Sequence, residues 1–291
     1  MFVFNLKLIQ EFERVKESEN GWKECAQLIV SDQQVNDQTR FFCMQIIENY
    51  LKTRYKSSTS QPDQMLLRQF MSQWLQLQIN RKANEKNFLT KKVAQLFALV
   101  SLIDFPNRWP TFFTDLIATA QWSIGNADFY LKVLAAIDSE IVDREIPRTN
   151  EEQILITFYK DSIRERCVSD LVESWYILLK ENNVKNPEIT CQTLDVIGAY
   201  ISWIDINLIV NSRFVEFFVY GLGQVELRET ACVCLEEVIS KRMEVRAKLK
   251  LIDYLWKDVL QAGAIALEQQ INLSNVIFLY ICYLFLHILY E

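Results

Sequence analysis

The feature that most constrains this chain is an apolar pattern of helical period that runs through nearly its whole length. Apolar residues recur at three- and four-residue steps, which places them on one face of a helix. The clearest predicted helices cover residues 40–55, 63–79 and 85–105, and Pro106 ends the third. Only six Gly and five Pro interrupt 291 residues, and no segment alternates for long enough to require a strand. The pattern predicts an all-α protein.

The predicted helices are separated by short breaks at intervals that suit helical hairpins. Pairs of helices repeat every 35–50 residues or so, which is typical of HEAT-type repeats. We therefore expect a HEAT-like helical-repeat solenoid, an α-α superhelix, and an irregular globular helical domain is the alternative. Residues 201–210 are rich in β-branched side chains but fit two helices that break at Asp205. The breaks lie near residues 19–21, 57–62, 80–84, 105–107, 125–126, 147, 182–187, 205 and 221–223.

The carboxyl-terminal segment 263–291 differs from the rest of the chain. No side chain between Glu268 and Glu291 carries a charge, and residues 276–290 are nearly all apolar. The segment has three interpretations: a membrane helix, a repeat helix that a following repeat covers, or sequence from a truncated or mispredicted reading frame. Its aromatic and β-branched content and the missing basic flank argue against stable membrane insertion. No low-complexity linker divides residues 1–262.

Charge and cysteine content narrow the class of protein. A net charge of −6 excludes a generic polyanion binder but leaves local basic patches open. The seven cysteines are odd in number and form no CxxC, so free, buried thiols in a reducing compartment are expected. The first residues show no signal peptide, which predicts a nuclear or cytosolic protein. The cysteines with apolar neighbours are Cys43, Cys167, Cys191 and Cys232.

The residues that catalysis or cofactor binding would need do not converge in the sequence. His287 is the single histidine and lies in the atypical tail, so no Ser-His-Asp or Cys-His arrangement is expected. Cys232 and Cys234 form the one close cysteine pair, and core packing explains them better than zinc. No GxxxxGK occurs, and the glycines 221 and 223 lack the third glycine of a dinucleotide motif. We predict no enzyme, no cofactor and no metal site.

Three basic stretches stand out against the acidic total. Such clusters on a helical array contact phosphates or the acidic face of a partner protein without reading bases, although each residue also fits a solvated outer face. A Trp-Pro pair, Trp109 and Pro110, is expected to open a helix, because proline fits the first helical turn. The basic stretches are Arg40, Lys52, Arg54 and Lys56; Arg81, Lys82, Lys86, Lys91 and Lys92; and Lys241, Arg242, Arg246, Lys248 and Lys250.

Particular words in the sequence resemble one family. KKVAQLFALV at 91–100 and DFPNRWPTFF at 104–113 resemble the amino-terminal hairpins of importin-β-type transport receptors. Five further words, in order and in one register between about residues 12 and 260, are similar to the exportin-T family, the receptors that carry tRNA out of the nucleus. They are FFCMQIIE at 41–48, AIDSEIVDR at 136–144, LVESWY at 171–176, GAYISWID at 198–205 and LRETAC at 227–232.

The resemblance implies the amino-terminal part of a nuclear transport receptor that binds Ran-GTP and mature tRNA together, passes nuclear pore proteins, and shuttles between nucleus and cytoplasm. It implies importin-β-like HEAT repeats at 1–83, exportin-1-like HEAT repeats at 84–262, and the atypical tail at 263–291. The alternative is a protein-binding HEAT-repeat scaffold that does not bind RNA directly. The residues expected to face Ran are Lys91, Lys92, Trp109 and Pro110, and those expected from charge to contact tRNA are Arg81, Lys82, Lys132 and Arg213.

Overall fold

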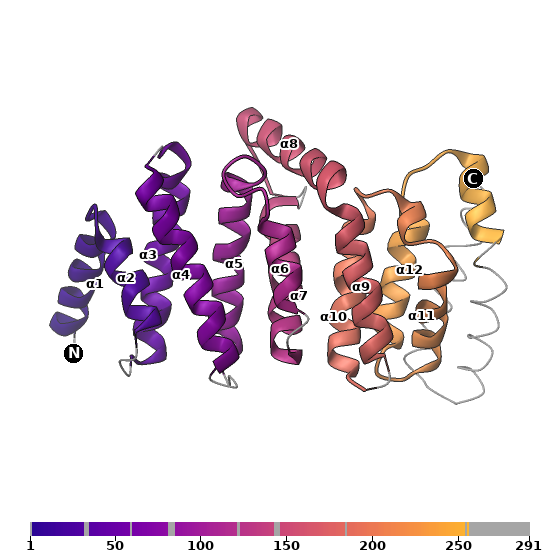
Figure 1. Ribbon diagram of the computed structural model, residues 1–291, viewed down its shortest axis with the longest axis horizontal. Helices are drawn as coiled ribbons and strands as arrows, with labels where there is room; N and C mark the ends of the chain where they lie inside the picture. The colour runs from indigo at the N-terminus through magenta and orange to yellow at the C-terminus, as the bar shows by residue number, and fades with distance from the viewer. Residues whose placement is uncertain are drawn as a thin grey trace. The chain divides into compact units, whose positions relative to one another are not determined.

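The computed structural model describes residues 2–31, 35–58, 60–80, 85–120, 123–142, 146–183, 185–253 and 255. Within these ranges every regular element is helical and no residue forms a strand (Figure 1). The all-α prediction is confirmed. The chain divides into two compact units, Met1–Tyr159 (unit 1) and Lys160–Glu291 (unit 2). The segment 263–291, with His287 and its three interpretations, lies outside the described residues.

Unit 1 is a stack of helical hairpins. Its elements are α1 (Phe2–Glu17), α2 (Gly21–Val30), α3 (Asp37–Thr53), the 3₁₀ turn η1 (Tyr55–Ser57), α4 (Gln61–Asn80), α5 (Asn87–Asp104), α6 (Phe112–Ala120), α7 (Ile124–Ile137), the π-helical turn η2 (Asp138–Val142) and the first part of α8 (Asn150–Arg166). Helices α2 and α3 form one hairpin and α6 and α7 another. Between hairpins, α3 packs on α5 and α5 on α7, while α2 packs on α4. The hairpins therefore form two helix layers.

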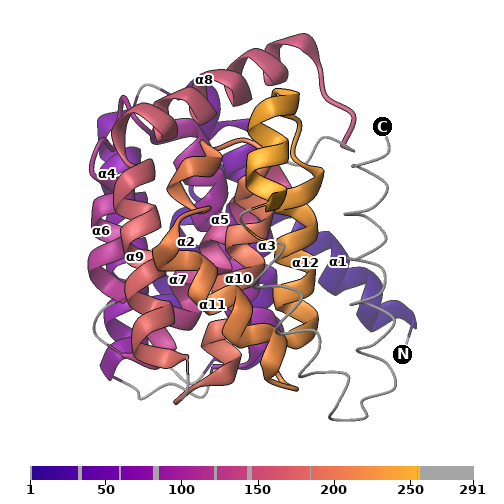
Figure 2. The same ribbon diagram turned by 90° about the vertical axis from the view of Figure 1, so that its right-hand side faces the viewer.

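Unit 2 repeats the same arrangement. It contains the end of α8, then α9 (Val168–Asn182), α10 (Pro187–Ile201), the 3₁₀ turn η3 (Ile206–Leu208), α11 (Ser212–Gly223), α12 (Arg228–Ser240) and a further helical stretch over residues 245–253. The hairpins α9–α10 and α11–α12 lie side by side in both views (Figures 1 and 2), with α10 packed on α12 and α9 on α11. Each unit thus has the stacked hairpins expected of a HEAT-like solenoid.

Side-chain caps explain where several helices begin. The side-chain oxygen of Asn36 accepts the Thr39 N–H at 2.8 Å and starts α3. Ser123 accepts the Asn126 N–H at 3.1 Å and starts α7. Before α10, Asn186 caps a helix whose first residue is a proline, a position where a missing N–H costs nothing. Each of these polar residues precedes an apolar helical run, so the helix starts are encoded locally.

Large aromatic side chains fill the space between the layers. In unit 1 the rings of Trp22 and Tyr50 stack with centroids 4.2 Å apart, joining α2 to α3. The rings of Trp74 and Phe129 are 4.7 Å apart and join α4 to α7. In unit 2 the buried Trp175 meets Tyr200 edge-on at 5.4 Å. Because each aromatic pair bridges two helices, burial is shared between neighbours along each stack.

The predicted helices at 40–55, 63–79 and 85–105 correspond to α3, α4 and α5. Three predictions were wrong in detail. The break near Gly125 falls earlier, because the Ser123 cap already starts α7 at Ile124. Pro110 does not open a helix, since it lies in the turn before α6, which begins at Phe112. Residues 201–210 hold one short 3₁₀ turn rather than a second α-helix, because Asp205 caps it and Asn211 soon starts α11.

The cysteines that the structure describes are free thiols. Cys43, Cys167, Cys232 and Cys234 are buried, and burial raises the pKa of Cys167 and Cys232 to about 12. Cys191 is an exception to the predicted burial. It is half-buried, and its Sγ donates to the Glu226 carbonyl oxygen at 3.3 Å. The pair Cys232 and Cys234 lies in the core of α12, as core packing predicts.

Candidate partner-binding surfaces

The adjacent lysines of α5, Lys91 and Lys92, have different environments. Lys92 is half-buried, and its ammonium donates to Glu48 Oε2 at 2.5 Å and to Gln95 Oε1 at 2.7 Å. It also lies 5.9 Å from the ring centre of Phe41. Lys91 is exposed and makes no ion pair with any residue in the described ranges. Lys91 is therefore the one of the two whose charge is open to a partner.

Lys92 belongs to a chain of side-chain hydrogen bonds that joins α3, α5 and η2, and we call this chain the ladder. Glu48 of α3 also accepts a hydrogen bond from the Lys52 ammonium at 2.7 Å. Burial alone would raise the pKa of Glu48, but the hydrogen bonds from Lys52 and Lys92 outweigh it and lower that pKa. Gln95 of α5 continues the ladder by donating to Glu140 of η2 at 2.9 Å. These hydrogen bonds fix the positions of α3, α5 and η2 relative to one another.

Exposed aromatic side chains lie beside this ladder. Phe42 of α3 and Phe88 of α5 are 52% and 46% exposed. Phe88 meets Phe41 with ring centroids 5.8 Å apart, and Phe42 meets Phe12 of α1 at 5.4 Å. We call Phe41, Phe42, Phe88 and Lys91 the α3–α5 surface. Half-exposed aromatic rings beside an open positive charge suit a protein partner, because such residues anchor interfaces.

The corner that carries Trp109 and Pro110 lies beyond the other end of α5. Thirteen residues of helix separate Lys91 from the end of α5 at Asp104, about 20 Å at 1.5 Å per residue. The Trp109 indole N–H donates to Asp115 Oδ2 at 2.9 Å. Pro110 is exposed. The residues expected to face Ran therefore lie in two separate places, near the start of α5 and in the corner that follows its end, rather than in one cluster.

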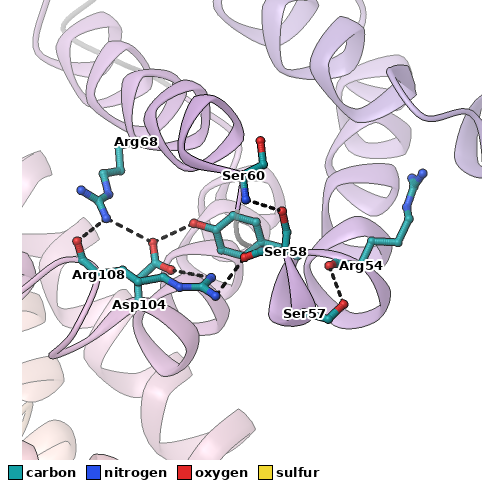
Figure 3. A network of polar contacts seen from close by, with 8 residues as sticks. Arg54, Ser57, Ser58, Ser60, Arg68, Asp104 and Arg108 are labelled. Carbon is teal, nitrogen blue, oxygen red and sulfur yellow. Dashed lines mark hydrogen bonds and ion pairs between the residues drawn. The ribbon is translucent and has the colours of Figure 1, made fainter.

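A buried carboxylate, the first residue of the word DFPNRWPTFF at 104–113, fixes this corner. Asp104 ends α5 with no exposed surface. Its Oδ2 accepts the Tyr55 hydroxyl at 2.8 Å and lies 3.8 Å from Arg68, and its Oδ1 lies 3.6 Å from Arg108 (Figure 3). Its main-chain oxygen accepts the N–H groups of Arg108 and Trp109 at 2.6 and 2.8 Å. One residue therefore ties α5, the corner and the turn η1 together.

Two arginines complete the network from neighbouring elements. Arg108 donates to the Ser58 carbonyl at 2.9 Å, and Arg68 of α4 donates to the Arg108 carbonyl (Figure 3). The Arg68 guanidinium also lies 5.4 Å from the Trp109 ring centre. Burial raises the pKa of Asp104, although the Tyr55 hydroxyl and both arginines oppose the rise. An Asp directly after the mostly apolar run 96–103 is the sequence signal that marks this site.

The residues expected to contact tRNA are in part outside the described ranges and in part already paired. Arg81 and Lys82 lie outside the described residues. Lys132 forms an ion pair with Asp128 one helical turn before it, at 2.6 Å. Arg213 donates to both carboxylate oxygens of Glu173 at 2.9 and 2.8 Å, and its guanidinium stacks 3.8 Å from the Tyr176 ring centre. In these positions Lys132 and Arg213 link neighbouring side chains within their own units.

The described residues offer neither a metal site nor a membrane span. No group of three or more His, Cys, Asp or Glu side chains in the described ranges is placed to hold a metal ion. Among the helices that the structure describes, none has the length and apolar content that crossing a membrane requires.

Comparison with known proteins identifies the family. Residues 86–235 match the model of the family described as Exportin 1-like protein, just over half of the chain. The chain belongs to this family. It is also similar to Exportin-T of Homo sapiens, with 39% identity over 267 residues. Exportin-T of Dictyostelium discoideum is 31% identical over 249 residues, and Exportin-T of Arabidopsis thaliana 28% over 229.

These relatives extend well beyond the matched region. The human match covers 92% of this chain and 28% of the relative, the Dictyostelium match 86% and 22%, and the Arabidopsis match 75% and 23%. The chain therefore spans about a quarter of the length of the exportins it matches. The resemblance to exportin-T is confirmed, and the stacked hairpins agree with the HEAT-like solenoid of this family.

Proposed function

We propose that this chain is part of a nuclear export receptor of the exportin-T kind, which carries mature tRNA through the nuclear pore with Ran-GTP. The observation that carries the proposal is the 39% identity to human Exportin-T over 92% of the chain. On this proposal the partners are Ran-GTP, tRNA and nuclear pore proteins, and the protein shuttles between nucleus and cytoplasm. The chain itself acts as a binding surface and performs no chemistry.

Lys91 and the Trp109–Pro110 corner are the proposed Ran contacts, and Lys92 supports them through the ladder to Glu48. The open charge of Lys91 and the half-exposed ring of Phe88 support this assignment. Stacked repeats bend by small rotations at each junction. If Ran-GTP and tRNA both favour the same curvature, each raises the affinity for the other by an equal factor.

The test measures Ran-GTP and tRNA binding to the 291-residue chain. The affinity for labelled tRNA should rise in the presence of Ran-GTP, and the affinity for Ran-GTP should rise by the same factor in the presence of tRNA. Lys91→Ala should weaken Ran-GTP binding about fivefold, which corresponds to about 1 kcal/mol. Lys180→Ala, which changes an exposed lysine of α9 that has no ion pair in the described ranges, is the control.

A protein-binding scaffold without RNA is the second candidate. The pairing of Lys132 with Asp128 and of Arg213 with Glu173, together with the net charge of −6, favours it. It predicts that Ran-GTP binds while tRNA does not, with or without Ran. A tRNA affinity that does not change with Ran-GTP would remove the export function from this chain.

A further inference from the structure

The segment 241–253, which follows α12, is rich in positive charge. Residues 241–253 include five basic and two acidic side chains, a net charge of +3 in a chain of net charge −6. Residues 245–253 of this segment are helical and form the yellow helix after α12 (Figure 1). The structure divides its five basic side chains into two groups with different surroundings.

Two of the five basic side chains bind main-chain oxygens inside unit 2. Lys241 donates to the carbonyl oxygens of Ile201 and Ile204 at 2.6 and 2.8 Å, where α10 ends. Lys248 is half-buried and donates to the Lys241 carbonyl at 3.4 Å. Burial lowers the pKa of Lys248. Lys241 therefore holds the segment against the end of α10, and Lys248 binds within the segment itself.

The other three basic side chains, Arg242, Arg246 and Lys250, are exposed, and we call them the basic cluster. None of them makes an ion pair or a side-chain hydrogen bond with a residue in the described ranges. Arg246 and Lys250 are one helical turn apart and so share a face, with their Cβ atoms about 6 Å apart. Arg242 precedes the helix and lies within about 13 Å of Arg246, the reach of four extended residues.

The acidic residues of the segment do not neutralise the basic cluster. Glu244 Oε2 accepts the Ala247 N–H at 3.1 Å and so caps the start of the helix. Asp253 makes no ion pair within the part of the chain that the structure describes. Val245 and Leu249 are 71% and 46% exposed beside the basic side chains.

The basic cluster differs from Lys132 and Arg213 in its ion pairing, and this difference indicates the kind of ligand. A phosphate that bound Lys132 or Arg213 would have to displace the carboxylate of Asp128 or Glu173. Within the described residues, a phosphate that binds the basic cluster displaces no carboxylate, and counterion release drives binding to nucleic acids. Several separate positive charges in a row suit a ligand that presents repeated negative charges along a backbone.

We propose that Arg242, Arg246 and Lys250 bind backbone phosphates of RNA and are the place where tRNA contacts this chain. The proposal rests on the export function proposed above and names its RNA-binding surface. The recognition is electrostatic and shape-dependent, as suits an RNA duplex whose major groove is too narrow for side chains.

The experiment compares two triple variants of the 291-residue chain. R242Q/R246Q/K250Q removes the basic cluster, and the control R166Q/K180Q/K185Q removes the same charge at three exposed residues of unit 2 that make no ion pair in the described ranges. Binding of a fluorescent tRNA transcript is measured between 50 and 200 mM salt, with and without Ran-GTP, and circular dichroism checks that each variant folds. The slope of log affinity against log salt is negative. Its magnitude should fall by about 2 to 3 for the cluster variant and stay unchanged for the control.

If the two lines meet at 1 M salt, a slope change of about 2 weakens tRNA binding about 100-fold at 0.1 M. Equal slopes for wild type and cluster variant would overturn the inference, and this is also the result for a cluster that contacts an acidic protein. Loss of binding in the cluster variant without any Ran dependence in wild type would support the cluster and refute the Ran-coupled function. A wild-type chain that binds no tRNA under any condition would refute both.

Discussion

The buried hydrogen bond from Tyr55 to Asp104 gives the sharpest test of how neighbouring hairpins are joined. Both side chains are fully buried, and the hydroxyl lies 2.8 Å from Oδ2. Tyr55→Phe removes the hydroxyl and keeps the ring. A hydrogen bond to a charged group contributes about 1.5–3 kcal/mol, so we expect the free energy of unfolding to fall by about 2 kcal/mol at pH 7. Oδ2 then keeps its ion pair with Arg68 at 3.8 Å.

The loss should depend on pH in a defined direction. Burial raises the pKa of Asp104 in the folded state, so its contribution favours folding at low pH and declines as pH rises through that folded pKa. Without the Tyr55 hydroxyl this pKa rises further, and at low pH only a neutral hydrogen bond of about 0.5–1.5 kcal/mol is missing. The destabilisation by Tyr55→Phe should therefore be larger at pH 7 than at pH 4.5.

Urea unfolding followed by circular dichroism at both pH values measures the change, and hydrogen exchange reports the corner directly. The amides of Arg108 and Trp109, which donate to the Asp104 carbonyl, should exchange faster in the variant. Tyr220→Phe is the control, because Tyr220 is half-exposed and makes no hydrogen bond within the described ranges, and it should change stability by less than about 0.5 kcal/mol. A Tyr55→Phe loss below about 0.5 kcal/mol, or one equal at both pH values, would refute the role assigned to Asp104.

Two further predictions concern unit 1. Gly21→Ala should lower the free energy of unfolding by about 1–3 kcal/mol, because a Cβ at Gly21 would lie 2.0 Å from the Val15 carbonyl oxygen. Gly125→Ala, where the nearest atom is 3.9 Å away, should be neutral or stabilising, and equal urea midpoints for the two variants would contradict the packing argument. Glu48→Gln should cost about 1 kcal/mol at pH 7, because the pKa of Glu48 is lowered despite its burial by Lys52 and Lys92. A carboxyl with a lowered pKa favours folding at neutral pH and loses that effect as pH falls below about 4, so the two proteins should converge near pH 3, and a constant difference would exclude the ionic bond.

The secondary structure followed closely from local signals because helix periodicity, caps and prolines act within a few residues. The stop at Pro106 and the cap at Asn186 are signals of this kind, and α5 and α10 begin or end beside them. Errors arose where two signals competed. Near Gly125, a glycine suggested a break, but Ser123 two residues earlier had already started the helix. The family words were also local, and they were confirmed by the match to exportins.

The candidate surfaces depended on partners far away in the sequence, which no local pattern reveals. Lys91 and Lys92 are neighbours of equal charge, yet among the described residues Lys92 alone of the two meets a carboxylate, because Glu48 reaches it from another helix. The same reason explains why Arg213 is paired with Glu173, while Arg242 and Arg246 make no ion pair with a carboxylate in the described ranges.

The amino-acid sequence by itself determined that this chain forms paired helices, where most of them begin and end, and which family it resembles. The stacking of the pairs decided which charges are open to a partner and which stabilise the fold, and it buried Asp104 among Tyr55, Arg68 and Arg108. The physical reason is range: helix formation depends on residues within one or two turns, whereas the energy of a charge depends on what packing brings within a few ångströms of it.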